Sequence, residues 1–107
     1  MTTFDKREEA FEKKFAHDEE LKFKAEARRN KLLGLWAAEK LGKTGADADA
    51  YAKEVIAADF EEAGDDDVLR KVAGDLAGRG TPVSDKDIRA KMDELMAVAI
   101  QQIQAGT

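Results

Sequence analysis

Helical periodicity is the feature that most constrains this chain. Apolar residues recur at steps of three and four throughout the sequence, and β-branched residues are sparse. The single proline, Pro82, lies between two of the periodic stretches, and cysteine is absent. With 107 residues, the chain is long enough for one domain and not for two. The sequence therefore predicts a single all-α domain.

Four periodic stretches have the features of helices that pack against one another. They are predicted at about residues 18–41, 46–63, 66–77 and 84–105. Gly42 and Gly64 follow the first two, and glycine is suited to the left-handed residue that ends a helix. Ser84, with Asp87 three positions on, forms a weak capping box. Short connections between such helices predict a small antiparallel four-helix bundle that occupies residues 18–107.

The first of these stretches has a wide apolar surface, which indicates contact with more than one neighbour. The surface comprises Leu21, Ala25, Leu32, Leu35 and Trp36, with Phe23, Ala27 and Leu41 on an adjacent face. Leu35 and, in the last stretch, Leu95 are expected in the core. Trp36 and Tyr51 are expected in the core or at seams between helices.

Residues 1–17 differ from the rest of the chain. No Leu, Ile or Val precedes Leu21, and Phe4, Phe11 and Phe15 fall at i, i+7 and i+11 of a helix. These three residues, called the Phe stripe below, form one narrow apolar line. Because isolated helices of this length are marginal in water, we expect residues 1–17 to be disordered or transiently helical in the free protein.

Composition excludes several classes of protein. The net charge is −5, which argues against nucleic acid as a partner because such binding depends on neutralising phosphates. No apolar run approaches the roughly 20 residues needed to span a bilayer, so no direct membrane insertion is expected. The charged N-terminus is not a secretory signal. The absence of cysteine is consistent with a cytoplasmic location.

The sequence contains no recognisable catalytic or metal-binding set. His17 is the only histidine, and we interpret it as a solvent-exposed or capping residue, or as a pH sensor through its ordinary pKa. Ser84 has no histidine near it in the sequence, so a cap is favoured over a nucleophile. Asp65, Asp66 and Asp67 lack the spacing of a calcium loop and are interpreted as a helix cap with acids that suit the helix dipole. We therefore predict that the protein is not an enzyme and has no cofactor or metal.

The densest basic cluster consists of Arg28, Arg29, Asn30 and Lys31. It is interpreted either as a solvated face or as a set of partners for Glu54, Glu61 or Glu62 on a neighbouring helix. In an alternative function, Arg28 and Arg29 would bind a ligand together with Arg79, which lies in a glycine-rich turn. That alternative is a ligand-binding bundle that senses purine nucleotides weakly. A further alternative is a general protein-interaction adaptor that uses the Phe stripe.

One long run of residues resembles a known family. The run KFAHDEELKFKAEARRNKLLGLWAAEKLG, Lys14–Gly42, closely resembles the signature of the zeta subunit family, the ATPase inhibitor proteins of the F-type ATP synthase of alphaproteobacteria. The opening FDKREEAFEKKFAHDEE is similar to that family's inhibitory region, and the resemblance extends over essentially the whole chain. It implies a four-helix bundle whose N-terminal segment blocks ATP hydrolysis. It also implies a location at the inner face of the bacterial plasma membrane, on the synthase.

The resemblance assigns roles to the first 17 residues. It implies that this segment enters a catalytic α/β interface as a helix and reaches the rotor γ subunit, while the bundle presents it. The Phe stripe would then fill apolar pockets of the partner, since aromatic side chains are effective anchors. Charged neighbours would set register and orientation, chiefly Lys6, Arg7, Glu8, Glu12 and Lys14. The free protein is expected to be a monomer.

Overall fold

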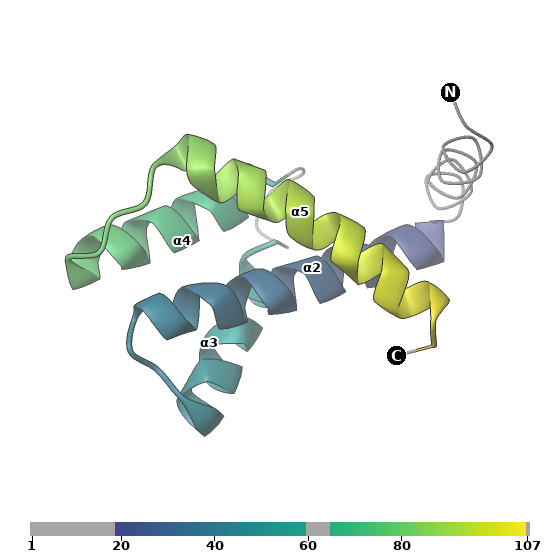
Figure 1. The fold of residues 1–107 in the computed structure, drawn as a ribbon, viewed down its shortest axis with the longest axis horizontal. Helices are drawn as coiled ribbons and strands as arrows, with labels where there is room; N and C mark the ends of the chain where they lie inside the picture. The colour runs from purple at the N-terminus through teal and green to yellow at the C-terminus, as the bar shows by residue number, and fades with distance from the viewer. Residues whose placement is uncertain (1–18, 60–64, 107) are drawn as a thin grey trace.

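The computed structural model describes residues 19–59 and 65–106, and these residues form four α-helices and no strands (Figure 1). The helices are α2 (Glu19–Lys40), α3 (Gly45–Ala58), α4 (Asp66–Arg79) and α5 (Asp85–Gln104). The prediction of a small all-α four-helix bundle is confirmed. The bounds of α2, α4 and α5 differ from the predicted ones by at most two residues at either end.

Helix α2 is the element on which the others assemble. It packs against each of the other three helices, and most extensively against α3 and α5. Helix α5 runs antiparallel to it, so that the end of α5 lies beside the beginning of α2 (Figure 1). There the Nη1 atom of Arg28 donates a hydrogen bond of 2.8 Å to Oε1 of Gln102. Helix α4 also contacts α3 and α5 directly, and α2 is the only helix of the described part that α3, α4 and α5 all contact.

Two glycines in the left-handed conformation end α2 and α4. Gly42 has φ 77°, and the N–H of Lys43 reaches back to the carbonyl of Ala38 at 2.9 Å. Helix α4 was predicted to end at Ala77, and this prediction is wrong. Gly78 stays helical, and Gly80 is the residue that takes a positive φ, of 89°.

The predicted cap of α5 by Ser84 is confirmed, whereas the predicted end of α3 is wrong. The Oγ atom of Ser84 accepts a hydrogen bond from the N–H of Asp87 at 3.1 Å. Helix α3 was predicted to run to residue 63 but ends at Ala58. The N–H of Asp59 bonds to the carbonyl of Ile56, a three-residue contact that tightens the last turn. Residues 60–64 lie outside the described part.

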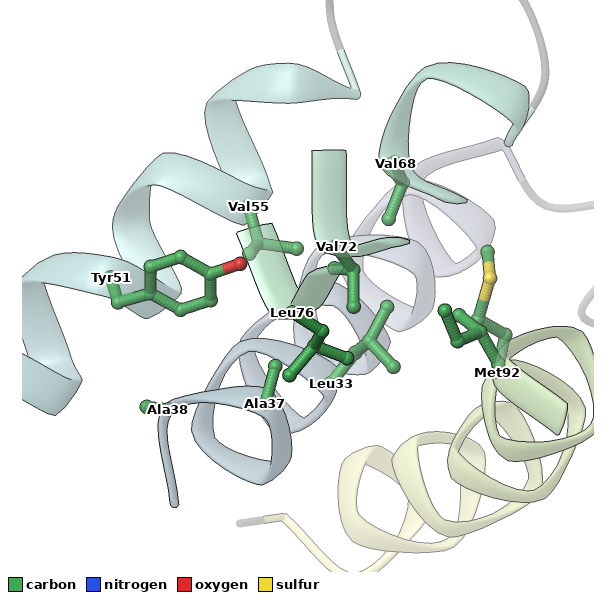
Figure 2. Close-up of a cluster of buried hydrophobic side chains, with 10 residues drawn as sticks. Leu33, Ala37, Ala38, Tyr51, Val55, Val68, Val72, Leu76 and Met92 are labelled. Carbon is green, nitrogen blue, oxygen red and sulfur yellow. The ribbon is translucent and has the colours of Figure 1, made fainter. Parts of the chain in front are cut away.

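All four helices contribute to one apolar core. Leu33, Val55, Val72, Leu76 and Ile88 have no exposed surface. Figure 2 shows side chains from α2, α3 and α4 converging with Met92 of α5. Trp36, which was expected in the core or at a seam, is partly buried and packs against this core. Leu95, which was expected in the core, is also only partly buried and packs against it.

The predicted register of α2 is wrong in detail. Leu33 is fully buried, while Leu32 and Leu35 are only half-buried and Phe23 is exposed. The buried positions follow steps of four from Ala25 through Arg29 to Leu33, and Ala37 continues the line. Leucines occupy positions 32, 33 and 35, so the apolar period alone does not indicate which of these side chains faces the core.

A close contact between backbones joins α2 to α3. A Cβ atom added at Gly34 would lie 2.6 Å from the Cα atom of Ala52 and 3.1 Å from its Cβ. Gly34 and Ala52 are both buried. The two helices therefore approach each other at a point where only glycine leaves enough space.

We expect Gly34→Ala to destabilise the bundle by about 1–3 kcal/mol, because the backbone of Ala52 would have to move. This loss would exceed the ~1 kcal/mol that alanine gains over glycine in helix propensity. Chemical unfolding followed by circular dichroism measures the difference. Gly74→Ala is the matched control, since nothing lies within 4 Å of an added Cβ there. That control should stabilise α4 by ~0.5–1 kcal/mol. Stabilisation by both changes would contradict the close contact.

Candidate functional site

The residues predicted to contact a partner precede the described part of the chain. They are Phe4, Lys6, Arg7, Glu8, Phe11, Glu12, Lys14 and Phe15, and His17 follows them. Their roles stay predictions. The structure does describe the bundle that begins at Glu19, directly after them, and it describes the charged groups of that bundle.

Arg29 is buried and forms the most extensive polar contact in the bundle. Its side chain is 3% exposed, and its Nη1 and Nη2 atoms donate to the two carboxylate oxygens of Asp65 at 3.3 and 2.8 Å. Its Nε atom donates to Oδ1 of the buried Asn30 at 2.8 Å. Arg29 was expected on a solvated face or opposite Glu54, Glu61 or Glu62. The solvated face is wrong, and the acid that Arg29 pairs with in the described part is Asp65 and not Glu54. Glu61 and Glu62 lie outside the described residues. Its position in the line of buried residues on α2 was the signal that sequence reasoning missed.

Two acids that flank residues 60–64 are perturbed in opposite directions. Burial raises the pKa of Asp59, although the Asn30 amide and the charge of Arg29 oppose this shift. The hydrogen bonds from Arg29 hold the pKa of Asp65 below its ordinary value, although burial acts the other way. Through Arg29, helix α2 thus pairs with the residue that precedes α4 and places a positive charge near the end of α3.

The three consecutive acids have three separate partners. Asp65 is at the N-cap position of α4 but makes no side-chain cap hydrogen bond, because its carboxylate faces Arg29. Asp66 pairs with Arg89 at 2.9 Å, and Asp67 accepts a hydrogen bond from the N–H of Val68. Among the described residues, no three acidic or histidine side chains are grouped as a metal site would require.

The three arginines proposed to bind a nucleotide do not lie together. Arg28 and Arg29 are on the first half of α2, where they bond to other side chains. Arg79 lies beside Gly42, beyond the other end of that helix. The 13 residues from Arg29 to Gly42 correspond to ~20 Å of helix axis. Nucleotide binding stays a prediction, without one shared arginine site.

Aromatic residues at the helix seams are covered by lysines. The hydroxyl of Tyr51 donates to Oδ2 of Asp75 at 2.9 Å, and burial raises the pKa of this tyrosine. Lys71 lies 5.3 Å from the Tyr51 ring centre and also pairs with Asp75. Lys40 lies 5.1 Å from the ring centre of Trp36. These contacts are structural, as expected for Trp36 and Tyr51.

None of the described helices combines the length and the apolar character that crossing a membrane requires.

Comparison with known proteins identifies the family. A family model described as ATPase inhibitor subunit zeta matches residues 1–102. The chain belongs to this family. The match to the zeta family includes residues 1–17 as well as almost the whole bundle, and it confirms the resemblance found in the sequence. The family is a regulatory one, and its name implies association with an ATP synthase.

One solved structure is similar to the chain in both sequence and fold. The chain is 57% identical to a protein whose structure was determined by solution NMR, with a TM-score of 0.72. The alignment covers 81% of this chain and 99% of the other one. No curated protein matches the chain.

The opposite pKa shifts of Asp65 and Asp59 predict opposite effects of neutralising them. Asp65→Asn should lower the stability of the bundle at pH 7, because hydrogen bonds to charged groups contribute about 1.5–3 kcal/mol. The lowered pKa of Asp65 means that this contribution is present at neutral pH and is lost as pH falls from the ordinary pKa of an aspartate through the lower pKa of the folded state. The difference between variant and wild type should therefore vanish in acid.

Asp59→Asn is the matched control for this experiment. The raised pKa of Asp59 means that its ionised form costs stability at neutral pH, so the amide should leave stability unchanged or raise it. Urea unfolding at pH 3 and pH 7 measures both variants. An Asp65→Asn variant with wild-type stability at pH 7 would contradict a role for the Arg29–Asp65 pair.

Proposed function

We propose that this protein inhibits ATP hydrolysis by the F-type ATP synthase through residues 1–17. In this proposal the segment enters a catalytic α/β interface as a helix and reaches the rotor γ subunit, at the inner face of the plasma membrane. The observation that carries the proposal is the family match, which begins at residue 1 and thus includes the Phe stripe.

The described residues form a core to which each of the four helices contributes. The buried apolar residues of the described part lie between Ala25 and Ala99, and all four helices contribute to them. Helices α2 to α5 bury these residues against one another. The proposal assigns the Phe stripe to a groove on another protein.

The proposed mechanism is a wedge that requires no chemistry by the inhibitor. A segment that binds one rotational state of the synthase better than the next shifts the population toward that state. If the segment folds as it binds, part of the binding energy is lost in ordering it. A few large aromatic anchors should then dominate the affinity.

Titration of the isolated catalytic sector tests the proposal. ATP hydrolysis would be measured with the full-length protein and with a version that lacks residues 1–17. Inhibition by the full-length protein alone would support the segment as the inhibitor. Absence of inhibition by both would contradict the proposed function and favour an adaptor with another target.

Single substitutions separate the inhibitory segment from the core. Phe11→Ala should weaken inhibition tenfold or more, from a loss of ~1.4 kcal/mol or more, and should leave the thermal melt unchanged. Leu33→Ala is the reciprocal control, because it should cost ~2–5 kcal/mol of stability while folded protein still inhibits. A large fall in melting temperature for Phe11→Ala would place that residue in the core instead.

A further inference from the structure

An open groove lies where the first half of α2 meets α3 and the end of α5. Its volume is about 320 Å³, and Ala27, Ile56 and Ile103 give it an apolar surface. Phe23 of α2 also lines this groove. We call this feature the Phe23 groove.

Phe23 is the only large apolar side chain that is exposed in the described part of the chain, and 55% of its surface is accessible. Burial of a phenylalanine is among the largest single contributions that a protein contact can gain. An exposed aromatic residue beside an apolar hollow is therefore typical of a surface that binds another protein.

The groove is also basic, on a chain whose net charge is −5. Lys24, Arg28 and Lys31 line it and follow one another at i, i+4 and i+7, along one line of α2. Lys22, Lys24 and Lys31 are exposed on this part of α2, and Lys24 also pairs with Glu20 at 3.2 Å. A surface with an apolar floor and a row of cations is complementary to an acidic amphipathic helix.

Its position connects the groove to the inhibitory segment. Phe23 follows Phe15, the last residue of the Phe stripe, by eight positions. That separation spans ~12 Å if the chain between them is helical and at most ~28 Å if it is extended. A protein that receives the Phe stripe must therefore have its surface close to the Phe23 groove.

We propose that the Phe23 groove is a second contact with the catalytic sector and binds an acidic amphipathic helix on the outside of that sector. This inference rests on the proposed function and names a further surface of the same complex. The groove would hold the bundle beside the inhibited interface, so that a segment that dissociates rebinds before the protein diffuses away.

The test uses three variants of the full-length protein. Phe23→Ala removes the aromatic anchor, and Lys31→Glu reverses one charge of the basic row. Lys43→Glu is the matched control, since Lys43 is exposed and lies beyond the other end of α2, ~18 Å along its axis from Lys31. Association with and dissociation from the immobilised catalytic sector would be followed at several salt concentrations, alongside inhibition of ATP hydrolysis.

We expect Phe23→Ala to raise the dissociation rate about tenfold, because lost anchors act mainly on dissociation. Lys31→Glu should slow association and reduce its dependence on salt, because surface charges act mainly on encounter. Lys43→Glu should change neither rate. All three melting curves should match that of the wild type.

The outcomes separate this inference from the proposed function. If Phe11→Ala weakens inhibition while Phe23→Ala and Lys31→Glu behave as wild type, the groove proposal is wrong and the inhibitor proposal stands. If the wild type does not inhibit, both are wrong. If Phe23→Ala strengthens inhibition, the groove binds residues 1–17 of its own chain. A parallel NMR titration with ADP tests the nucleotide alternative. If Phe23→Ala abolishes ADP-induced shifts and leaves binding to the catalytic sector unchanged, the groove is a nucleotide site. Either of these last two results would overturn the second contact.

Discussion

The ion pair between Arg29 and Asp65 determines how the second half of the bundle meets the first. A guanidinium that is 3% exposed must have a partner, since an unpaired buried charge costs several kcal/mol. Asp65 supplies two acceptor oxygens, and Asn30 supplies a third acceptor. The carboxylate is thereby diverted from capping α4, a role that contributes ~1 kcal/mol. Two charge-assisted hydrogen bonds contribute more than one cap, so the residue faces α2 and α4 begins without a side-chain cap.

The composition of the core explains how α2 can serve three neighbours. On its buried side it presents mainly small residues, including Ala25, Gly34 and Ala37, and these let helices approach closely. The buried volume comes chiefly from valine, leucine, isoleucine and methionine, and no phenylalanine belongs to the described core. Of the five phenylalanines, Phe23 is exposed, and Phe4, Phe11, Phe15 and Phe60 lie outside the described residues. Tyr51 is buried in this core and Trp36 packs against it, so the aromatic residues of the described part are divided between the core and the surface.

Features fixed by neighbours in the sequence were predicted well. The helices followed from the apolar period, and Ser84 and Gly42 were identified because a cap depends on residues within one turn. Features fixed by distant residues were not predicted. The burial of Arg29 depends on Asp65, 36 positions away, and no local pattern encodes that pairing. The end of α4 was also misplaced, since Gly78 stays helical and the positive φ that ends the helix occurs at Gly80.

The two proposed contacts differ in whether they must distinguish the rotational states of the synthase. The inhibitory segment has to distinguish one rotational state of the synthase, and tight binding to all states would defeat that purpose. The groove can bind without such discrimination, provided that its partner lies within reach of the segment. Linking the two raises overall affinity through effective concentration rather than through a stronger anchor. A rigid bundle is suited to this arrangement, because packing of α2 against α3 and α5 fixes the groove at the point where the segment ends. On this argument, the stability of the core contributes to inhibition by keeping one contact in place while the other exchanges.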